Sequence, residues 1–482
     1  MRRTTKTRLL LLTTLWWNAA ASATVSSELP ELGDSSSAIV SLETEQEIGK
    51  QLLRQVHAEV PTVSDPLLKY YTETQLYQLA EHSELKRKQL FPVLIDSPEV
   101  NAFAAPGGVV GINLGLYLTA EDVNEYSAVI AHELAHLSQR HFARQIEMQQ
   151  QSALPYLAAM LASIVIAATT GGQAGMAAMS GTQAIAQQNQ LQFSRDREAE
   201  ADRIGINTLA AADLDPAAMA KMFEQMQRAY RFSRRPPEFL LTHPVTETRI
   251  SYARDKAAEF PPKLYPDSED FQMMRARAMV HFAPSPEQAV TQFKTLVERT
   301  EGADWARYGL ILALARAGDH DAALDTAKPL FAKHPDSLLY MATQAQLLIG
   351  AARYAEAIEL LSAQLVINPE NKPLSIYLAE ALSGEKRFRE AQAVLLRQSI
   401  RNPDDVDIWY ELAETAGLAG DIVQVHLARA EYFMRVGNLQ KSIQHLEYAR
   451  GLVPHENYRL TAMLDQRIRD LSAELAESQR RS

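Results

Sequence analysis

The chain has 482 residues, which is too many for one hydrophobic core and predicts more than one domain. Apolar residues make up 46% of it and charged residues 22%, which excludes a mostly disordered, collagen-like or polytopic membrane protein. The absence of cysteine excludes disulfides, iron–sulfur clusters, thiolate zinc sites and cysteine nucleophiles, so His, Asp and Glu remain as metal ligands. A net charge of −11 argues against nucleic acid as a partner.

The amino terminus has the three parts of a secretory signal peptide. It begins with basic residues, continues with an apolar core over Leu9–Trp17 and ends in an A-x-A cleavage site at Ala21-Ser22-Ala23. The apolar core is far shorter than the roughly 20 residues that span a bilayer, which disfavours the alternative of an uncleaved anchor helix. We therefore expect removal of residues 1–23, and export of a cysteine-free chain indicates a bacterial periplasm.

After a loose arm over 24–42, the patterning predicts helices mixed with two short strands. Pro92 lies in the first strand and indicates an edge position, because proline cannot donate a hydrogen bond to a neighbouring strand. Thr119 and Asp122 resemble a capping box at the start of a long helix. The expected elements are helices over 43–58, 65–83 and 120–148, and strands over 89–95 and 109–114.

The long helix contains an H-E-x-x-H motif, His132-Glu133-Leu134-Ala135-His136. Residues i and i+4 lie one above the other on a helix, so both imidazoles can reach the same ion. Glu133 lies about 100° around the helix from His132, where it can sit beside a metal-bound water without binding the metal. Zinc lowers the pKa of that water to about 7, and the carboxylate would take its proton during attack on a carbonyl group. The motif predicts a peptidase with one zinc ion (Zn²⁺) per chain.

A catalytic zinc site needs a third protein ligand and one open position. The acidic segment 194–202 offers Glu198, Glu200 and Asp202. Glu198 and Asp202 are spaced i, i+4 and share one helix face, so Glu198 could bind zinc while Asp202 orients a ligand imidazole. Spacing alone does not choose between Glu198 and Glu200, and a solvated charged helix is the alternative to a ligand-bearing one.

HELAH on a long helix, followed by SRDREAEAD, resembles the M48 family of zinc metallopeptidases. The family pattern E-x-x-A-D falls on Glu198, Ala201 and Asp202, which implies that Glu198 is the third ligand. The resemblance implies a mainly α, zincin-like metalloprotease domain with a long active-site helix and a small β-sheet. In the family's fold, the Gly-rich strand after Pro106 borders the cleft and can pair with substrate backbone. This implies a substrate-binding edge strand made of Val109, Val110, Gly111, Ile112 and Asn113.

Another family element matches His243-Pro244 and the segment 246–249 that follows. One interpretation of His243 is a loop histidine with a local hydrogen bond. The alternative hypothesis is that it reaches the zinc as a fourth protein ligand and holds the enzyme latent. We expect the other histidines to be surface or packing residues; His141, for example, lies about 140° from the zinc-facing side of the predicted helix.

Residues 148–194 contain no charged side chain and directly follow the active-site helix. Three interpretations stay open, namely a helical hairpin packed in the core, a mobile lid over the cleft and a membrane-facing surface that makes peripheral membrane contact. Gln and Gly residues interrupt the apolar run, which argues against a full membrane span. Helical patterning returns at Arg195, and the Pro-rich segment 260–266 indicates the end of this domain.

The carboxy-terminal part repeats with a period of about 34 residues, which is typical of tetratricopeptide repeats. Such helix–turn–helix units stack into an α-solenoid that binds protein segments or partner surfaces. Pro454 follows the last regularly spaced proline after one and a half repeats, so we expect an irregular helix between them; a non-repeating bundle is the alternative. The period is carried by Pro335, Pro369, Pro403, Ala289, Ala323, Ala357 and Ala391.

Together these features predict a signal peptide over 1–23, an M48-like zinc metalloprotease domain over 24–265 and a tetratricopeptide-repeat domain over 266–482. The resemblance implies a periplasmic zinc endopeptidase in quality control of outer-membrane proteins, with unfolded or misassembled outer-membrane proteins as substrates. It also implies the outer-membrane β-barrel assembly machinery as a partner of the repeat domain. The alternative is a chaperone or assembly factor in which proteolysis is secondary.

Overall fold

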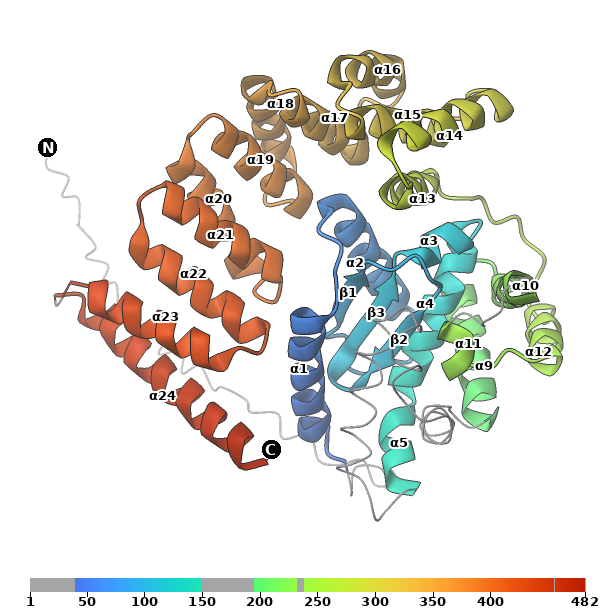
Figure 1. The fold of residues 1–482 in the computed structure, drawn as a ribbon. Helices are drawn as coiled ribbons and strands as arrows, with labels where there is room; N and C mark the ends of the chain where they lie inside the picture. Colours follow the sequence, from blue (N-terminus) through green and yellow to red (C-terminus); the bar gives the residue numbers. More distant parts are fainter. Residues whose placement is uncertain (1–39, 149–194, 232–237, 455, 482) are drawn as a thin grey trace, which may run out of the picture.

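The computed structural model describes residues 40–148, 195–231, 238–454 and 456–481, in which one small sheet accompanies many helices (Figure 1). This architecture confirms the predicted fold class. The predicted signal peptide, and all but the first residue of the uncharged segment 148–194, lie outside the described residues. Among the described residues, no helix combines the length and the apolar character needed to cross a membrane.

The amino-terminal part follows the predicted order of helices and strands. α2 begins after Asp65, whose carboxylate accepts hydrogen bonds from the backbone N–H groups of Leu67 and Leu68, with Pro66 at the first helical position. The predicted elements are confirmed here to within a few residues, and one short strand and one short helix are additional. The elements are α1 (Leu42–Glu59), α2 (Pro66–Glu81), β1 (Phe91–Ile95), β2 (Ala102–Ala105), the 3₁₀ turn η2 (Pro106–Gly108), β3 (Val109–Asn113) and α3 (Gly115–Thr119).

The sheet has the order β1–β3–β2, so β3 is its central strand. β1 runs parallel to β3 and β2 runs antiparallel to it. Pro92 lies on an edge strand, as predicted, and the second edge is β2. The additional strand was missed because AFAA is short and rich in alanine, which has low β propensity. The structure therefore contradicts the predicted edge strand of Val109, Val110, Gly111, Ile112 and Asn113, all of which are buried.

The predicted helix over 120–148 is divided into α4 (Val123–Ser138) and α5 (His141–Met148). Asp122, rather than Thr119, caps α4, because its carboxylate accepts a hydrogen bond from the backbone N–H of Glu125 at 2.9 Å. Arg140 has a φ of 49°, a left-handed conformation that a helix interior does not accommodate. The chain therefore changes direction directly after the motif helix.

α9 (Arg195–Ala211) packs along α4, and the segment expected to bear the third ligand thereby faces the motif. Gly205 permits this approach, since a Cβ atom there would lie 2.9 Å from Met219 Cε and 3.2 Å from the backbone nitrogen of His132. α12 packs against α9, and α10 packs against α4 and α12. The remaining helices of this part are α10 (Ala218–Arg231), α11 (Glu238–Thr242) and α12 (Glu247–Ala257).

From α13 onward the chain is an array of stacked helices, which confirms the predicted solenoid. The four alanines that carry the period are fully buried at the helix contacts. The helices are α13 (Glu269–Phe282), α14 (Pro286–Arg299), α15 (Asp304–Arg316), α16 (His320–Lys333), α17 (Leu338–Gly350), α18 (Tyr354–Ile367), α19 (Lys372–Gly384), α20 (Phe388–Arg401), α21 (Val406–Leu418), α22 (Ile422–Arg435), α23 (Leu439–Leu452) and α24 (Tyr458–Arg481).

The irregular helix expected between Pro403 and Pro454 is not there. Three regular helices of 13 or 14 residues, α21, α22 and α23, occupy the interval. Gly420 and Gly437 have φ values of 79° and 74°, and these left-handed glycines form the tight turns between the helices. The extra half-repeat is therefore one additional regular helix.

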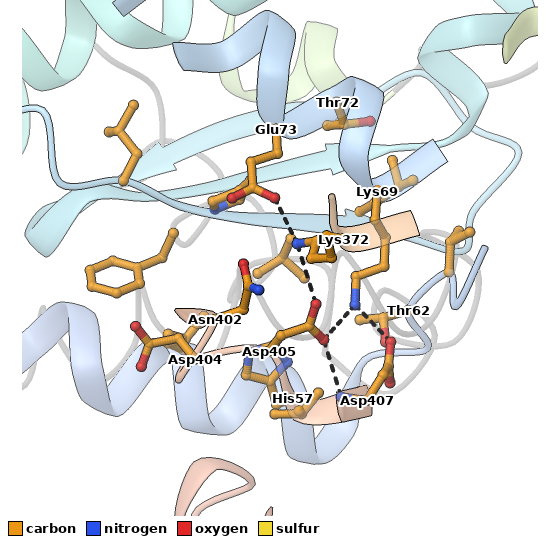
Figure 2. Close-up of a pocket in the computed structure, with 18 of the residues that line it drawn as sticks. His57, Thr62, Lys69, Thr72, Glu73, Lys372, Asn402, Asp404, Asp405 and Asp407 are labelled. Atoms are coloured by element: carbon orange, nitrogen blue, oxygen red, sulfur yellow. Dashed lines mark hydrogen bonds and ion pairs between the residues drawn. The ribbon is translucent and has the colours of Figure 1, made fainter. Parts of the chain in front are cut away.

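The solenoid curves around the amino-terminal part, so that α1 and α2 face its inner side (Figure 1). α13 and α19 pack against α2, and α22 contacts α1. A cavity of about 230 Å³ lies between α1, α2, β1 and the α20–α21 turn. Ion pairs cross this region, as Figure 2 shows: Lys69 Nζ lies 2.7 Å from Asp405 Oδ1 and 2.8 Å from Asp407 Oδ2, and Lys372 Nζ lies 2.7 Å from Glu73 Oε2.

Arg277 of α13 anchors α2 to the solenoid in the buried part of this contact. Its guanidinium donates to Asp65 Oδ2 at 2.8 and 3.0 Å. It also donates to Gln346 Oε1 and to the Tyr308 hydroxyl, both at 2.7 Å. One carboxylate therefore both caps α2 and binds the array.

We expect Arg277→Ala to lower the free energy of unfolding by about 3 kcal/mol, because it leaves buried polar partners without their donor. Urea unfolding followed by circular dichroism measures the loss. Arg353→Ala, which removes an exposed pair with Glu356, is the matched control and should change the stability by less than about 0.5 kcal/mol. Equal losses in the two variants would contradict the anchoring role.

Candidate metal centre

The centre begins with two imidazoles on α4. His132 and His136 are one helical turn apart, and their Nε2 atoms lie 3.0 Å from each other. Both side chains are buried, because every residue of α4 from Val123 to His136 is covered by neighbouring elements. Burial lowers the pKa of His136 well below its ordinary value, so its imidazole is neutral and its lone pair is available to a metal.

α9 adds a carboxylate between the two imidazoles. Glu198 Oε2 lies 3.5 Å from His132 Nε2, and Glu198 Oε1 lies 3.5 Å from His136 Nε2. In a tetrahedral zinc site with the usual bond lengths, ligand atoms are about 3.3 Å apart. The three side chains therefore fit a zinc ion by donor type and by spacing. Burial alone would raise the pKa of Glu198, but the imidazoles of His243 and His132 hold it well below its ordinary value.

His243 follows α11 and completes a group of four. Its Nδ1 lies 3.0 Å from Glu198 Oε1 and 3.4 Å from His132 Nε2. One ligand atom from each of the four side chains lies within 4.8 Å of the others. The loop histidine thus lies among the candidate ligands rather than in a purely local turn contact.

Glu133 lies beside this group and is almost fully buried. Burial raises its pKa, while the charges of His243 and His132 act in the opposite direction. The backbone of Ala104 in β2 also acts to lower its pKa, though less than those charges. A buried carboxylate with a raised pKa is suited to accept a proton from water near neutral pH.

Asp202 lies one turn after Glu198 and supports His132. Its Oδ1 is 3.0 Å from His132 Nδ1, the nitrogen that faces away from the centre. Burial opposes a charge on His132, but hydrogen bonds to Asp202 and Glu198 outweigh burial and raise its pKa to about 9. The two carboxylates therefore create a negative potential that favours a cation at this point.

Arg249 of α12 was not predicted as part of the site, yet it binds both carboxylates. It donates to the two oxygens of Asp202 at 2.7 and 2.8 Å, and its Nη1 lies 2.8 Å from Glu198 Oε2. Its guanidinium also stacks over the Phe223 ring at 4.7 Å. The match of the segment 246–249 to a family element was the available signal.

His141 is a buried histidine, within the expectation of surface or packing residues, but it also contacts a candidate ligand, which was not predicted. It is fully buried, with its Nδ1 2.9 Å from His136 Nδ1 and its Nε2 3.0 Å from Glu200 Oε2. The turn at Arg140 brings His141 back to the motif, which a continuous helix would not do. Glu200 is thereby directed to His141, and it is Glu198 that lies between the motif imidazoles.

We expect Arg249→Lys to weaken zinc binding by roughly 10- to 100-fold, because lysine keeps the charge but loses the bidentate hydrogen bonds to Asp202. Competition with a chromogenic chelator measures the affinity. Arg254→Lys on the same helix alters an exposed pair with Glu224 and should leave the affinity unchanged. Wild-type affinity in Arg249→Lys would contradict the supporting role.

Comparison with known proteins agrees with this geometry. Residues 66–257 match peptidase family M48, and residues 348–416 match a tetratricopeptide repeat. The beta-barrel assembly-enhancing protease of Escherichia coli (strain K12) is 32% identical over 441 residues, which cover 90% of this chain and 89% of that protein. The protein of the same name from Yersinia pestis is 31% identical over 443 residues and 91% of each chain.

A shorter match is the mitochondrial metalloendopeptidase OMA1 of Bos taurus, 32% identical over 168 residues that cover 33% of this chain and 31% of that protein. The match to the two bacterial proteases extends over both the metal-centre part and the helical array. The chain therefore belongs to peptidase family M48 and is a metalloendopeptidase that carries tetratricopeptide repeats.

Proposed function

We propose that this protein is an exported zinc endopeptidase that cleaves misfolded or stalled proteins during the assembly of outer-membrane β-barrels. The observation that carries the proposal is the convergence of His132, His136 and Glu198 next to a buried carboxylate, Glu133. The names of the bacterial relatives support the barrel-assembly context. The signal-like amino terminus supports a periplasmic location.

In the proposed reaction, His132, His136 and Glu198 hold the zinc ion. When bound, zinc supplies a Lewis acid and lowers the pKa of a coordinated water to about 7. Glu133 accepts a proton from the attacking water and later passes it to the leaving amine. Asp202 and Arg249 keep the His132 ring in place, and His141 does the same for His136.

β2 is the proposed binding edge for substrate. It is an edge strand and packs against α4, the helix that carries Glu133, so a peptide that pairs along β2 would lie beside that helix. An extended segment added to a sheet edge gains backbone hydrogen bonds without a strict sequence requirement. Such binding suits a peptidase whose substrates share an unfolded state rather than a sequence.

His243 is the proposed latency device. Its Nδ1 is close to Glu198 and to His132, and its Nε2 lies 3.6 Å from Glu133 Oε1. In this place His243 would occupy the fourth position of the zinc site, which the attacking water needs. While His243 stays in this place, it would restrain the enzyme among unfolded proteins. Withdrawal of the loop that carries His243 would open the fourth position.

The repeat domain is proposed to bind clients or the barrel-assembly machinery. Because α1 and α2 occupy the inner side of the arc, these proteins would contact its outer side or its ends. The uncharged segment 148–194 keeps its three interpretations, including peripheral membrane contact.

Glu133→Gln should abolish casein cleavage, with a loss of at least about 100-fold, because the amide cannot accept the proton. Zinc content by atomic absorption should stay near one ion per chain. Glu224→Gln, a change at a half-buried position on α10 away from the centre, is the control. Cleavage at the wild-type rate would contradict the assignment of Glu133, whereas a cleavage-deficient protein that supports every cellular phenotype would favour the assembly-factor role.

His243→Ala should cleave casein faster than the wild type while keeping zinc, because three protein ligands remain and the fourth position is open. Initial rates at equal zinc loading measure the effect. His281→Ala removes an exposed histidine that pairs with Asp96, and it should behave like the wild type. Activity of His243→Ala no higher than that of the wild type would refute latency.

A further inference from the structure

Helix α1 lies between the sheet and the far end of the solenoid (Figure 1). Its apolar face packs against η2 and β3 and shares an apolar cluster with residues of all three strands, and α1 also contacts α22. The residues of the apolar contact form a small cluster separate from the main core, made of Leu52, Val56, Val60, Val93, Ile95, Ala105 and Val109.

On the sheet side, α1 touches the turn that ends β2. A Cβ atom on Gly49 would lie 2.4 Å from the Pro106 carbonyl oxygen and 2.8 Å from Gly107 Cα, so the backbones of the helix and the turn are in direct contact. The strand that this turn terminates, β2, packs against α4, the helix that carries Glu133. A displacement of α1 would therefore be transmitted through the turn to β2, beside the helix of the catalytic carboxylate.

On the solenoid side, α1 makes charged contacts with α24. Arg54 and Lys50 both pair with Glu474 of α24, with Lys50 Nζ at 3.2 Å. Gly437 in the α22–α23 turn lies against Arg54. His57 lines the cavity (Figure 2), and its buried Nδ1 has no hydrogen-bond partner among the described residues. The contact of α1 with α24 is therefore polar, and the cavity at His57 belongs to a separate contact of α1, with the α20–α21 turn.

The far end of the solenoid is also a packing unit of its own. The nearer helices share one large apolar cluster with α2 and α4. A unit that has its own core and meets α1 through partly exposed ion pairs separates from α1 more readily than the nearer helices separate from α2. The cluster of this far end comprises Ala430, Leu439, Leu446, Ala449, Val453, Leu464 and Leu471.

We propose that the contact between α24 and α1 positions the β2 edge for substrate, with Arg54 and Glu474 as positioning residues. The inference rests on the proposed function, because it takes β2 as the substrate edge. While α24 stays in contact with α1, the turn after β2 keeps its position and extended peptides bind with their highest affinity. A partner protein that draws α24 away from α1 loosens β2 and weakens peptide binding without touching the metal centre.

A reversible disulfide tests this directly, because the chain has no other cysteine. With Arg54→Cys and Gly437→Cys, the two Cβ atoms are about 3.4 Å apart, close to the separation found in disulfides. Gly437→Cys alone is the control, because cysteine is strained at the φ of 74° that Gly437 adopts. In the reduced double variant, we expect the KM for an extended unfolded peptide to rise roughly two- to fivefold, with little change in kcat. Oxidation should return the KM to the wild-type value.

Charge reversal gives an independent arm with a matched control. Glu474→Lys repels Arg54 and Lys50 and should raise the KM as the reduced disulfide variant does. Glu414→Lys makes the same change in a pair with Arg429 that lies within the solenoid, and it should leave the KM unchanged. Equal KM values for Glu474→Lys and Glu414→Lys overturn the proposal, whether or not the disulfide forms.

Peptide binding without cleavage separates this proposal from the proposed function. The dissociation constant of the same peptide is measured by fluorescence anisotropy on full-length protein that carries Glu133→Gln. Binding that strengthens on oxidation of the Arg54→Cys, Gly437→Cys pair supports the positioning role even if no variant cleaves, and in that case only the peptidase proposal fails. Binding that is equal in the oxidised and reduced forms, with the disulfide verified by mass spectrometry, overturns the positioning role alone.

Discussion

Two carboxylates buried on the inner face of α9 govern the arrangement of the amino-terminal part. Glu198 and Asp202 are at most 2% exposed, a depth at which an uncompensated charge costs several kcal/mol. The compensating groups come from α4, as His132 and His136, and from α12, as Arg249. Three helices must therefore meet at one point, and Gly205 removes the side chain that would keep α9 from α4. The metal centre and the helix packing are consequences of the same charge balance.

His132 and His136 could be predicted from their spacing of four residues within one helix, whereas the choice of Glu198 over Glu200 needed the family pattern that also marks Asp202. Arg249 and His141 could not be predicted as supporting groups, because they reach the centre through tertiary structure. Arg249 is 47 positions from Asp202, and no local pattern connects them. His141 lies beside His136 only because the chain turns at Arg140, and hydrophobic periodicity does not reveal a single left-handed residue.

The same distinction holds for the fold: features set by neighbouring residues could be predicted, and features set by contacts between distant residues could not. Helix ranges and the 34-residue period follow from local patterning and were predictable. The order of three short strands depends on which backbone edges meet, so β2 was missed and β3 was placed at an edge instead of at the centre. The packing of α2 inside the solenoid arc likewise depends on contacts such as Lys69 with Asp405, which no repeat motif encodes.

The contacts between the first helices and the last ones also determine the order in which parts of the chain fold. Lys69 and Asp405 are 336 positions apart, and Lys50 and Glu474 are 424 positions apart. Closing such long loops costs conformational entropy, whereas the helix pairs of the array form through contacts between sequence neighbours. Local helix pairs therefore form first, and the contact between α1 and α24 forms only after α24 has been synthesised. A chain that stops before α24 lacks the partner of Lys50 and Arg54, so α1 has fewer contacts with the solenoid in such a chain.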